Sequence, residues 1–434
     1  MTDVTTPAAP PSRYRYYVLA ILIVVYTFNF IDRQILGILK DSIQTELGLT
    51  DTQVGLMGGI AFAALYSTLG IPIAWLADRY SRTWIMTGAL TLWSGFTAAC
   101  ALATSFWGLF ALRMGVGIGE AGGVAPAYSL ISDYFPPRQR GRALAAFSFG
   151  IPLGMALGIL LGGLIAASID WRAAFVVVGL AGLLIAPIFK LTVRDPKRGG
   201  LDAGPADQAP ADPAAAPAKA ASVPQVFNLL RRKPSFWLLA FGAAASSVCG
   251  YGVAFWLPTF FQRSLGLTLT ETAWYYSAIT LFGGVAGIWM GGALADRFGA
   301  KNRGAYALAP ALAFLVALPF FFLALNAPTL PIAFFLFLIP TGLNLAWLGP
   351  VITAVQHLAP PPMRATASAL FLLVNNLLGI ALGTYYFGWA SDLLKPWFGQ
   401  ESIRYAIYSG GGFYLVAATL LLLASRSLRK DWVD

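Results

Sequence analysis

The chain has 434 residues, of which 58% are hydrophobic and 11% are charged, with a mean hydropathy of +0.69 and a formal net charge of +10. A soluble domain of this length would carry about 25% charged residues, so the composition argues against a soluble protein and favours many membrane spans. With two cysteines and one histidine, the chain has too few ligands for a metalloenzyme site, and we expect no metal and no cofactor.

Apolar stretches long enough to cross a bilayer recur along the whole chain. A spanning helix needs about 20 apolar residues to cover a hydrocarbon core of about 30 Å at about 1.5 Å per residue. The first stretch is too long for a signal-peptide core, and we count it as a span. The sequence predicts an all-α membrane protein with twelve transmembrane helices, at 16–40, 52–77, 83–103, 105–135, 142–168, 171–191, 235–262, 270–295, 304–325, 330–358, 365–393 and 403–425.

Lysine and arginine are distributed unevenly between the two sides of these spans. With the N-terminus inside, 22 of the 29 Lys and Arg residues fall in inside segments and 5 fall in outside loops. This bias follows the positive-inside rule and predicts that both termini are cytoplasmic. Topology therefore explains the basic net charge, and we expect no nucleic-acid partner. We expect a monomeric, multi-pass integral membrane protein, in the plasma (inner) membrane if the source is bacterial.

A run rich in Ala, Pro and Asp at 197–224 interrupts the pattern of spans and is typical of an extended linker. The segment Val226–Lys233 that follows it combines apolar and basic residues, so it is either a short interfacial helix or a solvated stop signal. We expect an N-terminal six-helix half at 1–192, a cytoplasmic linker at 193–233 and a C-terminal six-helix half at 234–434.

The two halves repeat each other. Leu47–Thr50 recurs as Leu265–Thr268, 218 residues later, and each copy opens a span with a predicted capping box to Gln53 or Glu271. Two parallel halves with a site between them at mid-membrane are typical of a transporter. Two further pairs are Ala77–Arg79 with Ala295–Arg297, at an offset of 218, and Pro136–Arg140 with Pro360–Arg364, at an offset of 224.

Four charged residues lie well inside predicted spans and away from the span ends: Asp32 and Arg33 in the first, Arg113 and Glu120 in the fourth. Each such charge costs about 2.5–3.5 kcal/mol at the bilayer centre, so all four must face a protein or water-lined interior. Asp32 and Arg113 lie at matching depth, and we expect them to form a switchable pair while Glu120 takes up and releases a proton. Arg33 points elsewhere in this interpretation, towards an anionic headgroup or a gate carboxylate. The alternative is a static structural network.

The second half has no charges at the corresponding positions. Its spans instead offer aromatic and amide side chains, which suit a molecule with a headgroup and a chain. Ordinary helix packing is the alternative for any one of them. With Asn29 from the first span, the expected cavity-lining residues are Tyr251, Phe255, Trp256, Asn344, Trp347, Phe371, Asn375 and Asn376.

The segments Trp75–Arg82 and Gly292–Gly299 resemble the cytoplasmic gating motif of the major facilitator superfamily, although the first copy departs from it at Ala74 and Ser81. The resemblance covers nearly the whole chain. Asp78 near Arg140 or Arg142 would form ion pairs that close the inner face, or these charges would only enforce topology. The expected cytoplasmic gate residues are Asp78, Arg79, Arg82, Arg140, Arg142, Asp296, Arg297 and Arg364.

Within the superfamily, Asn29–Arg33, Gly119–Ala121 and Ser129–Pro136 most resemble the spinster-type lipid transporters. Organic anion–cation symporters share a similar Asp-Arg pair and the Arg and Glu of span four. The resemblance implies a secondary transporter, with protons as coupling ion, that moves a lysophospholipid or sphingolipid-like amphiphile by alternating access.

The alternatives to this lipid substrate are a proton-coupled organic anion symporter and a multidrug efflux transporter. An enzyme is not expected, because no Ser-His-acid set appears within the spans.

Overall fold

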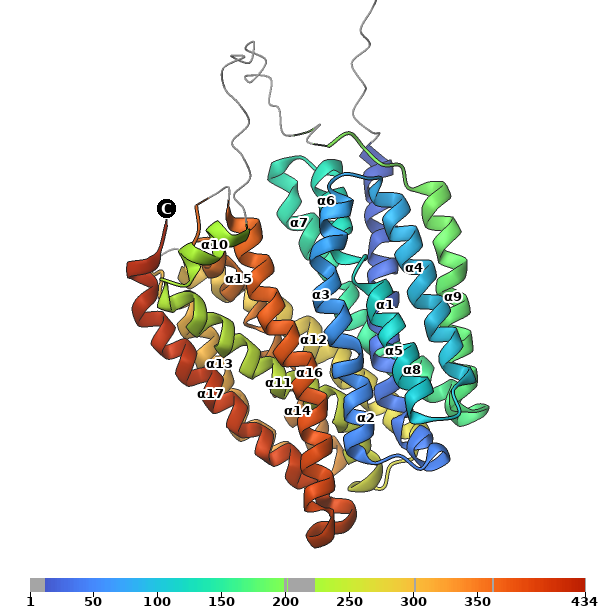
Figure 1. Ribbon diagram of the computed structural model, residues 1–434. Coiled ribbons are helices and arrows are strands. Elements are labelled where there is room, and N and C mark those ends of the chain that lie inside the picture. The colour runs from blue at the N-terminus through green and yellow to red at the C-terminus, as the bar shows by residue number, and fades with distance from the viewer. Residues whose placement is uncertain (1–11, 199–200, 202–222, 300–301, 361–362, 434) are drawn as a thin grey trace, which may run out of the picture.

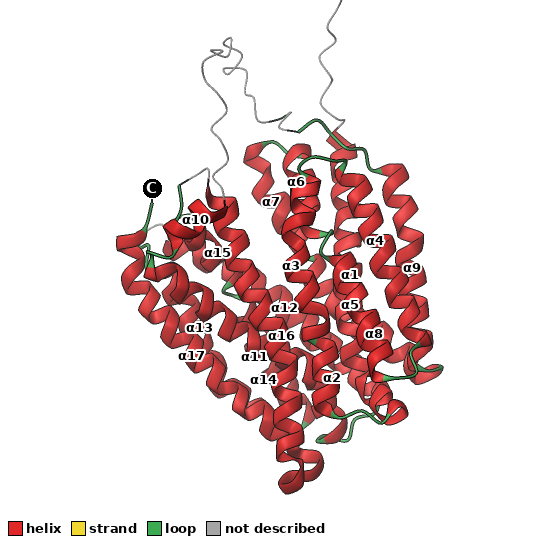
Figure 2. Cartoon of the chain, in the orientation of Figure 1, coloured by secondary structure: helices red, strands yellow, loops and turns green. Residues whose placement is uncertain are grey.

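A computed structural model describes residues 12–198, 201, 223–299, 302–360 and 363–433 (Figure 1). All regular structure in these residues is helical (Figure 2), which confirms the predicted all-α class. The predicted linker lies partly outside the described residues.

In the N-terminal half, most helices end within a few residues of the predicted spans. Three spans are each divided into two helices. One division is at Gly59, where a Cβ would collide with Thr384 of the other half. The helices are α1 (Ser12–Leu47), α2 (Asp51–Gly58), α3 (Ile60–Ala77), α4 (Arg82–Ala99), α5 (Phe106–Glu120), α6 (Val124–Tyr134), α7 (Pro137–Ser148), α8 (Gly150–Ser168) and α9 (Trp171–Thr192), with a 3-10 turn, η1, at Cys100–Leu102.

The C-terminal half begins with a short helix, α10 (Val223–Leu230), which buries Val226 and Leu230 against the core of that half. The segment predicted as either a helix or a stop signal is therefore largely helical. The remaining helices are α11 (Pro234–Arg263), α12 (Leu269–Gly299), α13 (Ala305–Leu325), α14 (Leu330–Leu345), α15 (Leu348–Gln356), α16 (Arg364–Phe398) and α17 (Ser402–Asp431), with a 3-10 turn, η3, at Gly399–Glu401.

Nine helical stretches in the described part of the chain are long and apolar enough to cross a membrane. One of them, Thr366–Asp431, contains both α16 and α17. The predicted spans 105–135 and 270–295 are not among them. The first is divided into α5, with 15 residues, and α6, with 11, whereas the second corresponds to the single helix α12.

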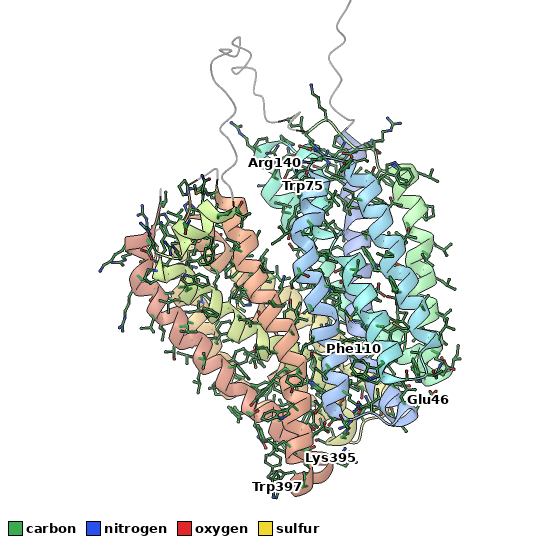
Figure 3. The ribbon with its side chains drawn as sticks, in the orientation of Figure 1. Glu46, Trp75, Phe110, Arg140, Lys395 and Trp397 are labelled. Carbon is green, nitrogen blue, oxygen red and sulfur yellow. The ribbon has the colours of Figure 1, made fainter. Side chains whose placement is uncertain are left out.

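The chain forms two helical bundles, one from α1–α9 and one from α11–α17 (Figure 1). The bundles meet where α16 packs on α2 and α3 and where α8 packs on α12. The two ends of the molecule are distinguished by labelled side chains in Figure 3. We call the end with α6, α7, α10, Trp75 and Arg140 the linker end, and the end with Glu46, Lys395 and Trp397 the distal end.

The repeated sequence motifs adopt the same local structure in both halves. Gly48 and Gly266, 218 residues apart, have φ values of +65° and +69°, in the left-handed region that glycine reaches at little cost. Both predicted capping boxes are present: Thr50 and Gln53 exchange hydrogen bonds, and so do Thr268 and Glu271. Each copy therefore makes the same turn into the next helix.

Candidate functional site

The four predicted intramembrane charges, here called the mid-membrane cluster (Asp32, Arg33, Arg113 and Glu120), come together from α1 and α5. Arg33 Nε donates to Glu120 Oε2 at 2.7 Å, and the Glu120 side chain is fully buried while that of Arg33 is 13% exposed. The prediction that Arg33 points elsewhere is wrong. That prediction was based on the depth of each residue along its helix. It did not include the length of the arginine side chain, which reaches the neighbouring helix.

Arg113 and Asp32 lie side by side, but their side chains do not form the expected ion pair. Arg113 Nη1 donates to the backbone carbonyl oxygen of Asp32 at 3.2 Å. The carboxylate oxygen Oδ1 of Asp32 is buried without a hydrogen-bond partner, although Trp93 and Thr97 of α4 are near. The matching depth of the two residues is therefore confirmed, whereas the switchable pair remains a prediction.

Many polar atoms around the mid-membrane cluster are buried and lack a hydrogen-bond partner in the described structure. Buried polar groups in proteins nearly always have one, and an unsatisfied group costs about 1–3 kcal/mol. Buried polar atoms gathered in this way occur at sites that exchange protons or a ligand and at sites that hold ordered water. The unsatisfied atoms are Asn29 Oδ1 and Nδ2, Asp32 Oδ1, Arg33 Nη2, Trp93 Nε1, Ser94 Oγ, Thr97 Oγ1, Arg113 Nε and Glu120 Oε1.

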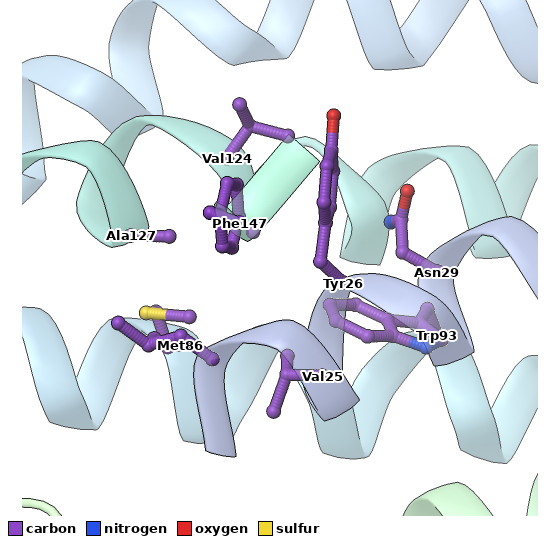
Figure 4. A pocket seen from close by; sticks show the side chains of 10 residues that line it. Val25, Tyr26, Asn29, Met86, Trp93, Val124, Ala127 and Phe147 are labelled. Atoms are coloured by element: carbon purple, nitrogen blue, oxygen red, sulfur yellow. The ribbon is translucent and has the colours of Figure 1, made fainter. Parts of the chain in front are cut away.

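A cavity of about 10 Å³ adjoins this cluster, between α1, α4, α6 and α7 (Figure 4). Asn29, Tyr26 and Trp93 contribute to its wall. A volume of this size holds about one water molecule, provided that polar groups are present to bond it. Most of its lining residues are apolar, among them Leu22, Val25 and Met86, so the cavity gives a water molecule few hydrogen-bond partners.

The guanidinium of Arg33 is surrounded by aromatic rings. It lies 5.0 Å from the ring centroid of Phe30, 4.8 Å from that of Phe62 and 4.5 Å from that of Tyr66. Phe62 and Tyr66 come from α3 and stack on each other. The sequence analysis did not single out these two residues, although their spacing of four places them on one helix face. Arg33 is thus held by a carboxylate on one side and by rings on others.

The expected aromatic and amide wall is only partly near the charges. Tyr251 of α11 lies within electrostatic reach of Arg33 across the interface between the halves. Trp347 and Phe371 contact each other in the core of the second half. Trp256 is fully buried and donates its indole N–H to the carbonyl of Thr384 at 2.8 Å.

The remaining expected lining residues are also in contact with protein. Phe255, beside Trp256, is 6% exposed. Asn375 accepts a hydrogen bond from Ser247 and donates to Asn376. Asn344 accepts a hydrogen bond from Tyr414. Their role in lining a cavity remains a prediction.

At the linker end, Arg82 is fully buried and holds together three segments of the N-terminal half. Its guanidinium bonds Asp195, Ser129 and Asp133, and it also donates to the carbonyl of Pro196 at 2.7 Å. Burial acts to raise the pKa of Asp195, but the hydrogen bonds and charge of Arg82 outweigh burial and lower this pKa below its ordinary value. Arg82 thus ties the segment after α9 to α4 and α6.

Within the described residues, Asp78 does not form the predicted ion pair with Arg140 or Arg142. Asp78 is exposed, and its side chain has no hydrogen bond or ion pair within the described residues. Arg79 lies over the Trp75 ring, 3.9 Å from its centroid. Arg142 and Arg297 are exposed, and the side chain of Asp296 lies outside the described residues.

Arg140 and Arg364 show that the repeat extends to side chains. Arg140 Nε donates to the Phe135 carbonyl at 3.0 Å, and Arg364 Nε donates to the Ala359 carbonyl at 3.3 Å. Both contacts reach back five residues, and the two copies are 224 residues apart. The two arginines therefore brace equivalent turns of the two halves.

The distal end carries a charged network that the sequence analysis missed. Arg263 of α11 donates to Asp41, Gln44 and Asp51 of the N-terminal half through five hydrogen bonds of 2.7–3.0 Å. We call these four residues the distal ion network. The sequence analysis counted Arg263 only as a charge in an outside loop. The feature that could have indicated the network is that Arg263, Asp41 and Asp51 all lie close to the ends of predicted spans.

Two further contacts strengthen this junction between the halves. Asp392 of α16 accepts from the backbone N–H and the hydroxyl of Thr52 at 2.7 and 2.6 Å. Lys40 is fully buried, donates to the Gly37 carbonyl and lies 5.3 Å from the ring centroids of both Phe255 and Trp256. The halves are therefore closed against each other at the distal end.

Comparison with known proteins gives consistent matches over nearly the whole chain. The family model for the Major Facilitator Superfamily matches residues 22–384. An MFS-type efflux pump of Mycolicibacterium smegmatis is 32% identical over 423 residues, which cover 97% of this chain and 95% of the pump. Protein spinster homolog 1 of Xenopus laevis is 30% identical over 442 residues, covering 94% of this chain and 82% of that protein.

A solved structure is also similar. It is the crystal structure of a bacterial homolog to the human lysosomal transporter Spinster, in an inward-facing and unoccupied conformation. The two chains are 31% identical with a TM-score of 0.86, and the match covers 98% of this chain and 99% of the other.

Proposed function

Because this chain belongs to the Major Facilitator Superfamily, we propose that it is a proton-coupled secondary transporter that moves an amphiphilic, lipid-like substrate by alternating access. It is an integral, multi-pass membrane transporter related to the spinster proteins, and it is not an enzyme. The identity of the substrate and the use of protons are the parts that we add, and they rest on the mid-membrane cluster.

The observation that carries the proposal is the buried Arg33–Glu120 ion pair among unsatisfied polar atoms. A buried charge pair is stable only while both partners are charged, because removing either charge leaves the other uncompensated. Protonation of Glu120 would therefore release Arg33. An anionic headgroup arriving at Arg33 would in turn compete with the Glu120 carboxylate and favour its protonation. Proton and substrate are thereby coupled through one guanidinium.

The surroundings of Arg33 support an amphiphile as the substrate. At 13%, the side chain of Arg33 is the most exposed of the cluster, and the rings of Phe30, Phe62 and Tyr66 surround its guanidinium. A cation set among aromatic rings suits a molecule with an anionic headgroup next to an apolar chain. A lysophospholipid or a sphingolipid phosphate has this form.

We further propose twelve spans with both termini in the cytoplasm, as the positive-inside bias predicts. α2 with α3, α5 with α6, α7 with α8, and α14 with α15 would each act as one span. The linker end would then be cytoplasmic, and the distal ion network would close the outer side, which agrees with the similarity to an inward-facing structure. We propose that the transporter acts as a monomer, in the inner membrane if the source is bacterial.

Efflux of unrelated, largely cationic compounds is a second candidate function, because the relative from Mycolicibacterium smegmatis carries the name of an efflux pump. The two functions differ in the charge of the substrate and therefore in the residue of the cluster that binds it. An amphiphilic anion would bind Arg33, whereas a cation would bind Glu120 and displace Arg33.

Transport by the purified protein in liposomes tests these proposals. The panel contains lysophospholipids, small organic acids and cationic dyes, each with and without an imposed pH difference. We expect lysophospholipid movement that responds to the pH difference, and we expect Glu120→Gln to abolish that response.

The matched control for Glu120→Gln is Glu46→Gln, which makes the same substitution in an exposed Arg–Glu pair at the distal end, with Arg172. It should transport like the wild type. An unchanged pH response in Glu120→Gln would show that Glu120 does not couple transport to protons. Transport of dyes or organic acids, without transport of lysophospholipids, would show that the substrate is not a lipid.

A further inference from the structure

A pocket of about 350 Å³ lies between the beginning of α13 and the end of α17, at the linker end and away from the mid-membrane cluster. Its lining residues are Asn302, Gly304, Leu308, Ser425, Arg426 and Arg429, none of them acidic. Its floor is a close approach of two backbones, since a Cβ at Gly304 would lie 2.8 Å from the carbonyl oxygen of Ser425. The volume is large enough for a phosphate group and its substituents.

The two arginines of the pocket are arranged to meet an anion. Arg429 Nη2 donates to Asn302 Oδ1 at 3.0 Å, and the same oxygen accepts the backbone N–H of Gly304. This contact fixes Arg429 and leaves the rest of its fork-shaped guanidinium available for an anionic ligand. Arg426 is exposed and has no hydrogen bond or ion pair within the described residues. Phosphate oxygens are the groups that paired guanidinium forks bind best.

An apolar strip leads away from the pocket along both helices. On α13, Leu312 and Leu315 are 50% and 38% exposed and follow Leu308 at helical spacing, so they continue the face that lines the pocket. On α17, Leu415 and Leu423 are exposed on the face that carries Arg426. A ligand with a phosphate at one end and acyl chains at the other would contact both surfaces.

Aromatic side chains place the pocket near the level of lipid headgroups. Trp432 stacks on His357 with ring centroids 4.4 Å apart and on Tyr306 at 5.5 Å, and the Arg303 guanidinium lies 5.6 Å from its ring centroid. Tryptophan and tyrosine gather at the boundary between hydrocarbon and water. The polar part of the pocket therefore lies where phosphates of the membrane lie.

We propose that this pocket binds the headgroup of an anionic phospholipid of the cytoplasmic leaflet, as a bound lipid distinct from the transported substrate. The proposal rests on the proposed orientation of the linker end, because basic pockets between helices on that side recognise anionic headgroups. The acyl chains lie along α13 and α17. Arg426 and Arg429 contact the phosphate.

The test compares binding of phosphatidylglycerol to the full-length protein and to the double variant Arg426→Ala/Arg429→Ala in detergent, by native mass spectrometry. The matched control is Arg231→Ala/Arg232→Ala, which removes two exposed arginines from the same end of the C-terminal half, outside the pocket. Each basic side chain near an anionic headgroup contributes about a fivefold gain in affinity, so we expect binding to the pocket variant to weaken about tenfold or more. The control variant should lose far less of its affinity for phosphatidylglycerol.

Two further ligands distinguish the source of the phosphate. Phosphatidylglycerol should raise the melting temperature of the wild type, whereas inorganic phosphate and phosphatidylcholine at the same concentration should not. Equal phosphatidylglycerol binding by the two double variants would overturn the proposal, and so would stabilisation by inorganic phosphate alone. The binding measurement does not involve transport, so its failure is distinguishable from failure of the proposed transport function.

Discussion

The distal ion network and the mid-membrane cluster contain similar groups but use them differently. In the distal network, one guanidinium from the C-terminal half meets two carboxylates of the N-terminal half and bonds to both. In the mid-membrane cluster, all four charges belong to the N-terminal half, and each of the four has at least one buried polar atom without a partner. A satisfied network across the interface stabilises the arrangement of the halves seen here, whereas the cluster within one half leaves several polar atoms without a partner, as our proposal of a partner exchange requires.

The comparison has an energetic side. Removing one partner of a buried ion pair typically costs about 3–5 kcal/mol, because the remaining charge is left uncompensated. In the proposed alternating-access cycle, this cost would fall in the distal network only on the closed arrangement, since both sides would be hydrated once the halves separate. In the mid-membrane cluster the cost falls on every conformation in which Glu120 stays buried.

Arg263→Ala should therefore have the largest effect on conformation. Asp51, which is 1% exposed, loses its charged partner, and the closed distal side becomes less stable by about 3–5 kcal/mol. Such a change shifts the ratio of outward-open to inward-open protein by about 10²-fold or more. Spin labels on cysteines introduced at Thr45 and Lys395 would report a longer distance. The native Cys100 and Cys249 are buried and should give little background labelling.

The control for this variant is Arg404→Ala. Arg404 also belongs to the C-terminal half, but it pairs with Glu401, three residues away in the same half. Its loss should leave the label distance unchanged. An unchanged distance in Arg263→Ala as well would show that the distal network does not hold the halves together.

Arg33→Ala should have the next largest effect, on transport and not on the distance between the halves. A charge-assisted hydrogen bond contributes about 1.5–3 kcal/mol, so we expect transport driven by a pH difference to fall about tenfold to 100-fold. Arg33→Lys keeps the charge but loses the planar fork, and its activity should lie between those of Arg33→Ala and the wild type. Wild-type rates in Arg33→Ala would remove Arg33 from the mechanism.

Much of the fold could be predicted from hydropathy, because each span carries its own signal. The stretch 171–191 corresponds to α9 (Trp171–Thr192), and 304–325 corresponds to α13 (Ala305–Leu325). The division of 105–135 after Glu120 could not be read from hydropathy, because Gly122 and Gly123 break the helix without reducing its apolar character. Close packing explains the first of these glycines, since a Cβ at Gly122 would lie 2.7 Å from Ala89 Cβ.

The site was predictable in its members and less so in its contacts. Charges such as Asp32 and Glu120 are conspicuous in apolar stretches, so their functional role could be expected. Their partners depend on how far side chains reach between helices, which the sequence does not contain. Arg263 and Asp51 escaped notice because a charge at the end of a span looks the same whether it faces water or crosses an interface.

Asp32→Asn should have a small effect on stability. Arg113 bonds to the backbone carbonyl of Asp32, and this acceptor remains after the substitution. We expect the free energy of unfolding to change by less than about 1 kcal/mol, the net contribution of one typical hydrogen bond, because the hydrogen bond between the two residues remains. Thermal unfolding in detergent measures it, with Asp51→Asn in the distal network as the comparison. If Asp32→Asn lowered the free energy of unfolding as much as Asp51→Asn does, the Asp32 carboxylate and Arg113 would have to be paired.

Asp195→Asn should have the smallest effect, and its dependence on pH identifies it. Arg82 bonds Asp195 within one half, so this contact is satisfied like the distal network but cannot influence how the halves separate. Since the pKa of Asp195 is lowered on folding, its carboxylate stabilises the protein above its ordinary pKa of 3.8, and this contribution is lost as the pH falls through the lower, folded-state pKa. Melting curves of the wild type and Asp195→Asn should therefore differ by a constant amount from about pH 7 to pH 5 and converge in more acidic buffer. The matched control is Asp78→Asn, at an exposed carboxylate of the same end that has no ion pair within the described residues, and it should melt like the wild type. A changed label distance in Asp195→Asn would contradict the distinction between contacts within a half and contacts across the interface.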